Sequence, residues 1–273
     1  MNPAEYYLSG LSSSKLLYAY SLRRVVPGYT GLAITVRRGN TATVQDFSFD
    51  PTTGLLDTNA IVAFVGPTLV GYVSKWYDQS GNGNTLGVTG AVPSREPIIV
   101  QSGAAITRGG RLAMNFSGSN FNNLKSATTL SIPVNNLSIF TVITSAGANY
   151  NAMSLKTNAN IGTVTFPRGS GSQDITNYNN TDLINLGAAG APVKVYSMLS
   201  TPSTISSWKN NVLISTLNVT NTNIATRIDL GYQTINNGLT YLNYNGTHQE
   251  ILIYQGNPSR AAITAEMMTY YGL

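Results

Sequence analysis

The sequence has no cysteine, a single histidine and few charged side chains. The lack of cysteine excludes disulfides and thiolate metal sites. Charged residues make up 10% of the 273-residue chain, against about a quarter in an average soluble domain. Any acid–base or metal chemistry must therefore use 11 carboxylates and one imidazole.

Long apolar runs and targeting features are also missing. No stretch approaches the roughly 18 apolar residues of a membrane span. The opening segment, MNPAEYYLSGLSSSK, has neither the basic start nor the apolar centre of a secretory signal. We therefore expect a chain that stays inside the cell or leaves it without the general secretory route. A virus particle that assembles in the cytoplasm and is released by lysis would satisfy both conditions.

Positive charge is present but dispersed. The net charge is +5, and the lysines and arginines are scattered apart from the pairs Arg23-Arg24 and Arg37-Arg38. Nucleic-acid-binding proteins concentrate basic residues on one face or in one run, so we expect no nucleic-acid partner. Anionic glycans remain open as partners.

Small polar residues and 16 tyrosines take the place of the missing charge, and this composition is typical of short strands joined by turns. Apolar side chains alternate with period two through most of the chain. The segment SSWKNNVLIS is the clearest hairpin, because Asn210 and Asn211 tolerate left-handed backbone. The polar stretch 169–190 predicts a long surface loop or an ordered insertion. The predicted strands are 16–22, 32–38, 43–49, 70–77, 98–100, 112–116, 137–144, 152–156, 162–166, 193–200, 204–209, 212–217, 227–232 and 246–254.

Two segments predict helices. LLDTNAIVAFVG has Asp57 or Thr58 as a cap, a short apolar run and Gly66 as a stop, which predicts a short helix near 57–65. NPSRAAITAEMMTYYGL begins with Asn257 as a cap and ends at Gly272, which predicts a helix near 258–270 that packs on a sheet. The economical arrangement is a single all-β domain of two packed sheets.

Several stretches together resemble one family. They are AYSLRRVVPGYTGLAITVRRGNTATVQDFSFD (19–50), LLDTNAIVAFVG, WYDQSGNGN (76–84), REPIIVQSGAAITRGGRLAMNFSGSNFNNL (95–124) and HQEILIYQGNPSRAAITAEMMTYYGL (248–273). They resemble the catalytic domain of the α-L-arabinofuranosidase B family. They resemble at least as much a group of uncharacterised bacteriophage structural proteins with the same concanavalin A-like jelly roll. The resemblance is dense over 16–124, returns at 246–273 and is weak between them.

The resemblance implies a concanavalin A-like β-sandwich over 16–273, preceded by an N-terminal segment, 1–15, that would serve as an assembly contact. It does not by itself carry activity. The family's enzymes use a Glu on a central strand as nucleophile and an Asp in a Gly-rich segment as acid/base. A retaining glycosidase needs these two carboxyl groups about 5 Å apart.

The segments of this chain that match those two catalytic regions are poor in acids. The first, 149–158, contains no carboxylate, and the second, 228–246, contains only Asp229. The adjacent cysteines of the fungal enzymes are absent as well. We therefore expect a non-enzymatic protein.

Two further residues are candidates for acid–base chemistry. His248 stands at the start of a predicted strand with no second histidine to share a metal site, so we expect a hydrogen-bonding role at a strand edge. Glu250 follows in the same strand. If its neighbours Ile251 and Ile253 face the core, Glu250 points outward or toward the concave sheet. Glu250 is the acid to substitute in a test of the hypothesis that the protein is an enzyme.

Asp78 opens the segment DQSGNGN, which allows two interpretations. Oxygens of Asp78, Ser80 and Asn82 have the spacing of a calcium loop, but Thr89 stands where such a loop needs a bidentate Glu. A site with one carboxylate would bind Ca²⁺ weakly, so we expect no cofactor. Alternatively, Asp78 accepts backbone hydrogen bonds and pins a turn whose glycines adopt positive φ; its replacement would then destabilise the fold.

The doubled arginines are candidate partners for an acid below the sheet, because neighbouring strand residues point to opposite faces. We hypothesise that Arg24, Arg37 or Arg38 forms a buried ion pair. The partner would be Asp78 or Asp46.

Tyrosines mixed with amide side chains are the candidate sugar site, since sugar rings stack on aromatic rings and bind polar groups through their hydroxyls. The same residue types also suit strand surfaces and turns. The candidates lie in the segments NYNAM, NYNN, GYQTINNG and YLNYNG, and are Tyr150, Asn151, Tyr178, Tyr232, Gln233 and Tyr244.

These observations favour a non-enzymatic, virion-associated, lectin-like domain, such as a capsid spike, head fibre or tail-fibre tip. It would bind glycans on a bacterial host or decorate the particle, with other virion proteins and copies of itself as partners and without membrane insertion. Two alternatives remain: an arabinofuranosidase-like hydrolase of host polysaccharide, and a purely structural capsid protein.

Overall fold

The computed structural model describes most of the chain from Lys15 onward. The described residues are 15–88, 93–118, 122–126, 130–145, 150–156, 162–170, 173–178, 181–188, 190, 192–220, 224–235 and 240–273.

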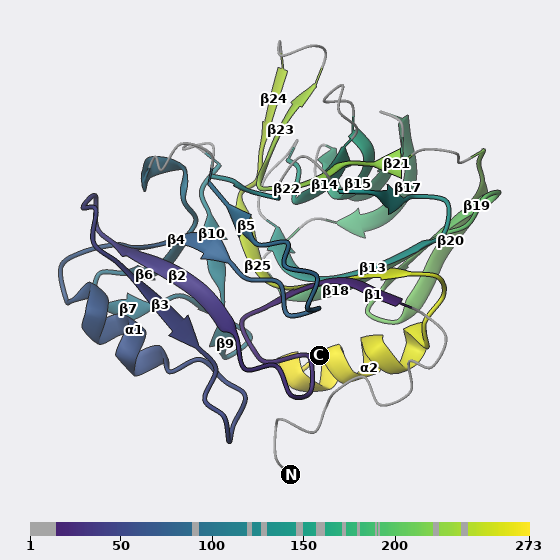
Figure 1. Cartoon of the computed structure of the whole chain (residues 1–273). Helices are drawn as coiled ribbons and strands as arrows, with labels where there is room; N and C mark the ends of the chain where they lie inside the picture. The colour runs from purple at the N-terminus through teal and green to yellow at the C-terminus, as the bar shows by residue number, and fades with distance from the viewer. Residues whose placement is uncertain are drawn as a thin grey trace.

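The described strands form a continuous 19-stranded sheet that folds over on itself, with three further two-stranded pairs. The result is a β-sandwich of two layers joined at one side, with one long helix below it (Figure 1). The expected all-β, concanavalin A-like jelly roll is therefore confirmed.

We name the two layers after an element of each. The α2 layer has the order β10 (Met114–Phe116) and β1 (Lys15–Ser21), β25 (Gly246–Gln255), β13 (Leu137–Ser145), β18 (Lys194–Ser200), β19 (Thr204–Lys209), β20 (Val212–Asn218). The β22 layer has the order β5 (Leu86–Gly87), β11 (Leu124–Lys125), β22 (Arg227–Leu230), β14 (Met153–Lys156), β15 (Gly162–Ser170), β16 (Gln173–Tyr178), β17 (Thr181–Ala188).

A third group of strands joins the layers, because β4 pairs with β5 and β6 pairs with β10. Its order is β3 (Val44–Ser48), β2 (Leu32–Arg38), β4 (Gly71–Trp76), β6 (Ile98–Gln101), β7 (Ala104–Ala105). The separate pairs are β8 (Thr107–Arg108) with β9 (Arg111–Leu112), β12 (Ile132–Pro133) with β21 (Ile224–Ala225), and β23 (Tyr232–Ile235) with β24 (Thr240–Asn243).

Both predicted helices are present. In α1 (Thr58–Val65) the carboxylate of Asp57 accepts a hydrogen bond from the N–H of Ala60, as an N-cap does. The long helix α2 (Arg260–Tyr271) ends at Gly272, whose backbone is left-handed. Its N-cap position is Ser259 rather than the expected Asn257. A short 3₁₀ turn, η2 (Pro93–Arg95), precedes β6. None of the described helices is long and apolar enough to cross a membrane.

Apolar side chains are buried on both faces of the α2 layer. The main core fills the space between the two layers. A smaller cluster on the other face packs Leu252 and Tyr254 of β25 against Ile263 and Met267 of α2. Because this layer is covered on both sides, all of β13 and nearly all of β25 are buried.

Two local predictions had different outcomes. The hairpin turn at Asn210 and Asn211 is formed, with φ values of 46° and 66°, and it joins β19 to β20. The stretch 169–190, predicted as a loop or an ordered insertion, contains the antiparallel pair β16 and β17. Its polar residues did not reveal the strands because cross-strand pairing, not local alternation, holds them.

Candidate functional site

The outer face of the β22 layer, opposite the core, carries a row of polar side chains. Lys125 of β11, Asp229 of β22 and Ser154 of β14 are direct partners across neighbouring strands. Ser154 in turn pairs with Thr165 of β15. Partners in register share one face of a sheet, so these side chains lie side by side. We call this set, with Lys156 and Arg227, the polar face.

Alternation along each strand explains this arrangement. In β14, Met153 and Leu155 belong to the core, so Ser154 points away from it. In β22, Ile228 and Leu230 are the core residues, and Asp229 takes the opposite face. The polar face is therefore a direct consequence of where the apolar residues stand in each strand.

Asp229 is the centre of charge pairing on the polar face. Its carboxylate lies 3.0 Å from Nζ of Lys156 and 2.7 Å from Nε of Arg227. Nη2 of Arg227 donates a second bond of 3.0 Å, which makes the pair bidentate. The side chains of Asp229 and Lys156 are almost fully buried, whereas that of Arg227 is 19% exposed. The group therefore extends from the protein interior to the surface.

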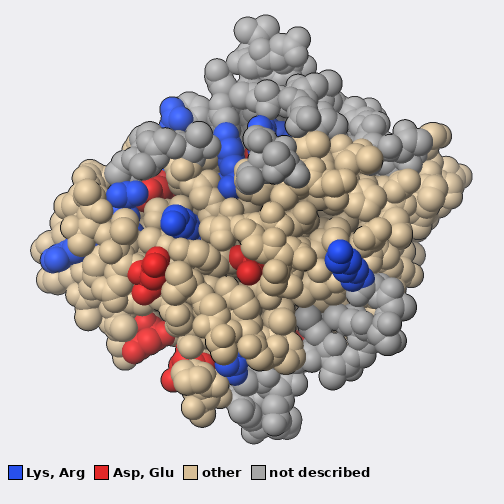
Figure 2. Space-filling view, in the orientation of Figure 1, with Lys and Arg blue, Asp and Glu red and all other residues tan. Residues whose placement is uncertain are grey.

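The two lysines of the polar face experience opposing effects. Burial lowers the pKa of Lys125, Asp229 raises it, and Arg227 and Arg95 lower it again. The pKa of Lys156 is also lowered, mainly by burial, with Asp229 acting against this. Figure 2 shows several Lys and Arg side chains in the upper part of the molecule and others spread over the rest of this view.

The aromatic sugar candidates are not exposed on this face. Tyr150, Asn151 and Tyr244 are each at most 1% exposed. The ring of Tyr244 packs against Tyr150 and against His248, with centroids 5.4 and 5.0 Å apart. Tyr150 and Tyr244 are part of the core, because their rings supply apolar area between the layers, and a sugar cannot stack on them there. The buried side chain of Asn151 instead donates through Nδ2 to Oγ of Ser154 on the polar face.

For the other three sugar candidates, the structure describes the backbone but not the side chains. Tyr178 falls at the end of β16, and Tyr232 and Gln233 fall in β23. Their side chains are outside the described part of the structure.

Asp78 lies at a turn after β4. Its carboxylate accepts hydrogen bonds from the backbone N–H of Ala19 (2.9 Å), of Ser80 (2.9 Å) and of Asn84 (3.4 Å). Nδ2 of Asn82 donates to the carbonyl of Leu17. Gly81 and Gly83 have φ values of 85° and 75°. The turn therefore binds β1 through backbone groups, and burial, partly offset by these bonds, raises the pKa of Asp78.

The expected ion pair of Asp78 or Asp46 with an arginine is not formed among the described residues. Arg37 instead makes a bidentate pair with Glu96, with Nε 2.9 Å from Oε2. Arg24 and Arg38 donate to the backbone carbonyls of Pro51 and Val65. The reason is that the backbone N–H groups of β1 and of its own turn already satisfy Asp78.

His248 is fully buried in β25, which has partners on both sides, so it is not at a strand edge. Its Nε2 lies 2.9 Å from the carbonyl of Ala152. Burial lowers the pKa of this imidazole to about 4. The neutral ring is packed between Phe116 and Tyr244. The imidazole ring therefore contributes to the packing of the core.

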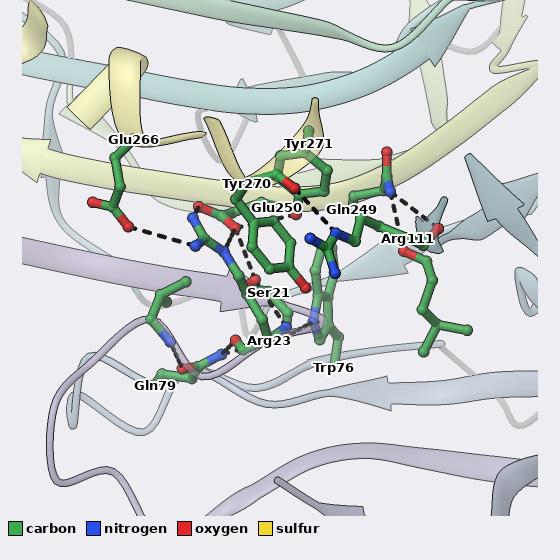
Figure 3. A network of polar contacts seen from close by, with 12 residues as sticks. Ser21, Arg23, Trp76, Gln79, Arg111, Gln249, Glu250, Glu266, Tyr270 and Tyr271 are labelled. Carbon is green, nitrogen blue, oxygen red and sulfur yellow. Dashed lines mark hydrogen bonds and ion pairs between the residues drawn. The ribbon is translucent and has the colours of Figure 1, made fainter. Parts of the chain in front are cut away.

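Glu250 faces α2 rather than the solvent (Figure 3). Arg23 binds it through Nε at 2.7 Å and Nη2 at 3.1 Å, and the hydroxyl of Tyr271 donates to it at 3.1 Å. Nη1 of Arg23 also reaches Glu266 of α2 at 3.5 Å. The ring of Tyr270 lies 4.1 Å from the guanidinium of Arg23. This buried network attaches α2 to the sheet.

Another buried carboxylate, Asp174 of β16, was not identified from the sequence. Nζ of Lys194 lies 3.0 Å from it, and the hydroxyls of Tyr150 and Tyr196 donate to it. Burial, with Asp174 nearby, raises the pKa of Tyr196. No local motif marks this cluster, since its members come from β16, from β18 and from the segment before β14. Among the described residues, no group of three or more His, Asp or Glu side chains could hold a metal ion.

Comparison with known proteins shows the fold. No family model matches the sequence, and no curated protein matches it. A GH54 α-L-arabinofuranosidase soaked with a cyclic sulfate inhibitor is similar in structure, with a TM-score of 0.74 and 14% identity. So is an arabinofuranosidase complexed with arabinofuranosyl-α-1,2-xylobiose, with a TM-score of 0.73 and 15% identity.

Both alignments cover 99% of this chain and 64% of the arabinofuranosidase chain, so this chain spans less than two thirds of those proteins. The binding domain of Paraclostridial Mosquitocidal Protein 1 is also similar, with a TM-score of 0.52 and 10% identity over 72% of this chain and 50% of that one. The chain therefore has the concanavalin A-like jelly-roll fold that these structures share.

Proposed function

We propose that the chain is a non-enzymatic, lectin-like domain that binds sugar at the polar face. The observation that carries the proposal is the pair of partly exposed cations Lys125 and Arg227, which lie beside the buried Asp229 on the side of the β22 layer opposite the core. Their cationic groups can donate to sugar hydroxyls. The bidentate bond from Arg227 to Asp229 holds the guanidinium in a fixed position.

The partners of the described carboxylates support a binding role rather than hydrolysis. A retaining glycosidase needs one carboxylate as nucleophile and another as a proton donor, about 5 Å apart. On the polar face, Asp229 already binds Lys156 and Arg227. Glu250 and Glu266 share Arg23, but this site is buried under α2 and Glu250 is fully buried.

The biological setting is part of the proposal. The motifs at 19–50 and 76–84 resemble bacteriophage structural proteins, which supports a place in a virion as a spike or fibre component. In that setting the ligand would be a glycan on a bacterial host surface, and the neighbours would be other virion proteins or further copies of this chain. Light scattering on the purified protein tests self-association: a monomeric mass at micromolar concentration contradicts the homo-oligomer.

A glycan array with the purified chain tests the binding role. We expect binding to a limited set of glycans and at least a tenfold loss in Arg227→Ala, since a hydrogen bond to a charged group contributes about 1.5–3 kcal/mol. Asp229 keeps Lys156 as a partner in this variant, so the fold should survive. Arg24→Ala is the matched control, because Arg24 contacts a backbone carbonyl far from this face.

Two results would contradict the proposal. One is a folded protein that binds no glycan on the array. The other is hydrolysis of an aryl-arabinofuranoside that a single carboxylate substitution abolishes, which the similarity to the arabinofuranosidase structures makes the appropriate enzyme assay.

A further inference from the structure

A polar cavity of about 470 Å³ lies outside the polar face. Its lining comes from the ends of β6 and β7, from β8 and from β10, and includes no residue of the polar face. Small apolar side chains at 104–106 supply part of the lining. The residues with polar side chains are Gln101, Ser102, Thr107, Arg108 and Asn115. The volume is within the range of small-molecule sites, roughly 300–1,000 Å³.

Strands from two tight hairpins line this cavity. The turn between β6 and β7 contains Ser102 with a φ of 51°, and the turn between β8 and β9 contains Gly109 and Gly110 with φ values of 57° and 71°. Two-residue turns of this kind fix the register of their strands. Ser102 has a side chain where glycine or asparagine is favoured, so its hydroxyl stands at the cavity at an energetic cost.

The hairpin of β8 and β9 is held in place from the protein side. Gln249 of β25 is fully buried, and its Nε2 donates to the carbonyls of Arg108 at 3.1 Å and of Leu112 at 3.2 Å. A Cβ atom on Gly109 would lie 3.1 Å from the carbonyl oxygen of Tyr271, so the turn rests against the end of α2. The side chain of Arg108 therefore extends from a fixed backbone, as a preorganised binding group requires.

Two arginines of this hairpin stand opposite each other. Arg108 and Arg111 are register partners, and like charges in such positions are destabilising. The guanidinium of Arg111 is directed to α2, since it donates to the carbonyl of Tyr270 at 3.0 Å and lies 4.3 Å from that ring (Figure 3). Arg108 is exposed, and its guanidinium donates only to the carbonyl of the preceding Thr107, at 2.8 Å, within the described part of the chain. The charge of Arg108 is therefore available to an anion.

The remaining polar groups define the rest of the ligand. Asn115 points away from the core, because its neighbours Met114 and Phe116 belong to it. The carboxamides of Asn115 and Gln101 form no hydrogen bond with other described residues. A carboxamide both donates and accepts, which suits a sugar hydroxyl. A guanidinium such as that of Arg108 binds a carboxylate through two parallel hydrogen bonds.

We infer that this cavity binds an acidic sugar, a ring with several hydroxyl groups and one carboxylate. Arg108 binds the carboxylate, Gln101 and Asn115 bind hydroxyls, and the ring packs on the small side chains at 104–106. A neutral sugar would leave the guanidinium without an anion, and a carboxylate without hydroxyls would leave both carboxamides unused. The inference goes beyond the proposed function, because this site shares no residue with the polar face and does not depend on it.

Three probes of similar size test the ligand class. Glucuronate has the hydroxyls and the carboxylate, glucose lacks the carboxylate, and cyclohexanecarboxylate keeps the ring and the carboxylate but lacks the hydroxyls. Each probe is titrated into the isotope-labelled chain, and the shifts of the amide NMR signals give both Kd and location. We expect a Kd for glucuronate at least tenfold lower than for the other two probes. The largest shifts should occur at 101–108 and at Asn115.

Four variants localise the effect. Arg108→Gln should weaken glucuronate binding at least tenfold and leave the affinity for glucose unchanged. Arg108→Lys keeps the charge but loses the planar fork, so its affinity should lie between those of the parent and of Arg108→Gln. Gln101→Ala should weaken the binding of both sugars. Arg24→Gln is the matched control, because Arg24 also donates to a backbone carbonyl, and it should have no effect. The unfolding midpoint verifies that each variant is folded.

The contrary outcomes are distinct. Equal affinity for glucose overturns the acidic ligand, and equal affinity for cyclohexanecarboxylate overturns the sugar. Glucuronate shifts centred on Lys125 and Arg227 overturn the location, and a folded protein that shows no shift with any probe overturns the site. An empty glycan array beside glucuronate binding in this cavity contradicts the proposed function alone, whereas array binding without these shifts contradicts this inference alone.

Discussion

At the scale of single residues, buried polar groups in this protein mostly stabilise structure. Asp78, His248 and Glu250 looked like candidates for chemistry because each is an ionisable residue in a sequence with few charged side chains. In the structure each is at most 5% exposed. Each also has specific protein partners. Their effects should therefore be seen in stability measurements before any binding assay.

Asp78→Ala should destabilise the fold. The substitution leaves the backbone donors of Ala19 and Ser80 without their acceptor in a buried site. A loss of about 2–4 kcal/mol in the free energy of unfolding is expected, measured by urea denaturation. Asp50→Ala is the control, because Asp50 makes similar turn contacts but is exposed, and it should cost less. An unchanged midpoint for Asp78→Ala contradicts the structural role.

The stability of the protein should depend on His248 below neutral pH. The imidazole has a pKa of about 4 in the folded protein, lowered by burial from its usual 6.5. The unfolded chain therefore takes up a proton first as the pH falls. The stabilising effect of the neutral ring is complete above pH 6.5, decreases between pH 6.5 and about pH 4, and is lost below about pH 4. The free energy of unfolding should fall by about 2–4 kcal/mol over this range.

Comparison with His248→Gln isolates this contribution. A glutamine amide can donate to the carbonyl of Ala152, as His248 can, but does not titrate. Unfolding curves between pH 4 and 7 should therefore show a smaller loss of stability in the variant than in the parent. Parallel pH dependence of the two proteins would contradict the lowered pKa of the imidazole.

At the scale of elements, α2 is attached by charge as well as by apolar packing. Its residues Ile263 and Met267 cover the α2 layer, while Tyr271 and Glu266 bind the buried pair of Arg23 and Glu250. Removing one partner of such a pair leaves a buried charge unpaired, whereas removing both does not. The helix and the pair should therefore respond together to substitution.

A double-mutant cycle tests this coupling. Arg23→Met should cost about 3–5 kcal/mol, because Glu250 then remains buried without its cation. The double variant Arg23→Met with Glu250→Leu should be more stable than the sum of the two single losses implies. Arg24→Met, next in sequence but bonded only to a backbone carbonyl, should change stability by less than about 0.5 kcal/mol. Strict additivity in the cycle would contradict the buried pair.

At the scale of the whole molecule, the first and last described strands are neighbours. β1 pairs with β25 from Lys15 opposite Gln255 to Ser21 opposite Glu250. The main core includes residues of both layers and of the group that joins them. Contacts between distant parts of the chain therefore hold the sandwich together, and one domain over 16–273 stays a prediction.

A single cooperative unfolding transition is expected for this reason. Differential scanning calorimetry should give one peak, with equal calorimetric and van't Hoff enthalpies. A glycan identified on the array should shift this peak upward, since a ligand that binds only the folded state stabilises it. Two resolved transitions would instead show that the layers unfold as separate units.

The sequence alone determined most of the secondary structure and the fold class. Alternation of apolar residues predicted the strands of the α2 layer, and Asp57, Gly272 and the Asn210-Asn211 turn were correctly assigned their local roles. These features depend on residues close together in the chain, where capping, turn chemistry and side-chain period act directly. The resemblance of a few motifs then predicted the sandwich.

The tertiary structure decided which of these residues form a site. Lys125, Lys156 and Asp229 are distant in sequence and meet only because β11, β14 and β22 pair in one register. The same packing turned Tyr150 and Tyr244 into the core, although their composition suited a sugar platform. Local pattern specifies that a strand forms, but strand order and register decide which side chains converge, because those depend on contacts between segments far apart in the chain.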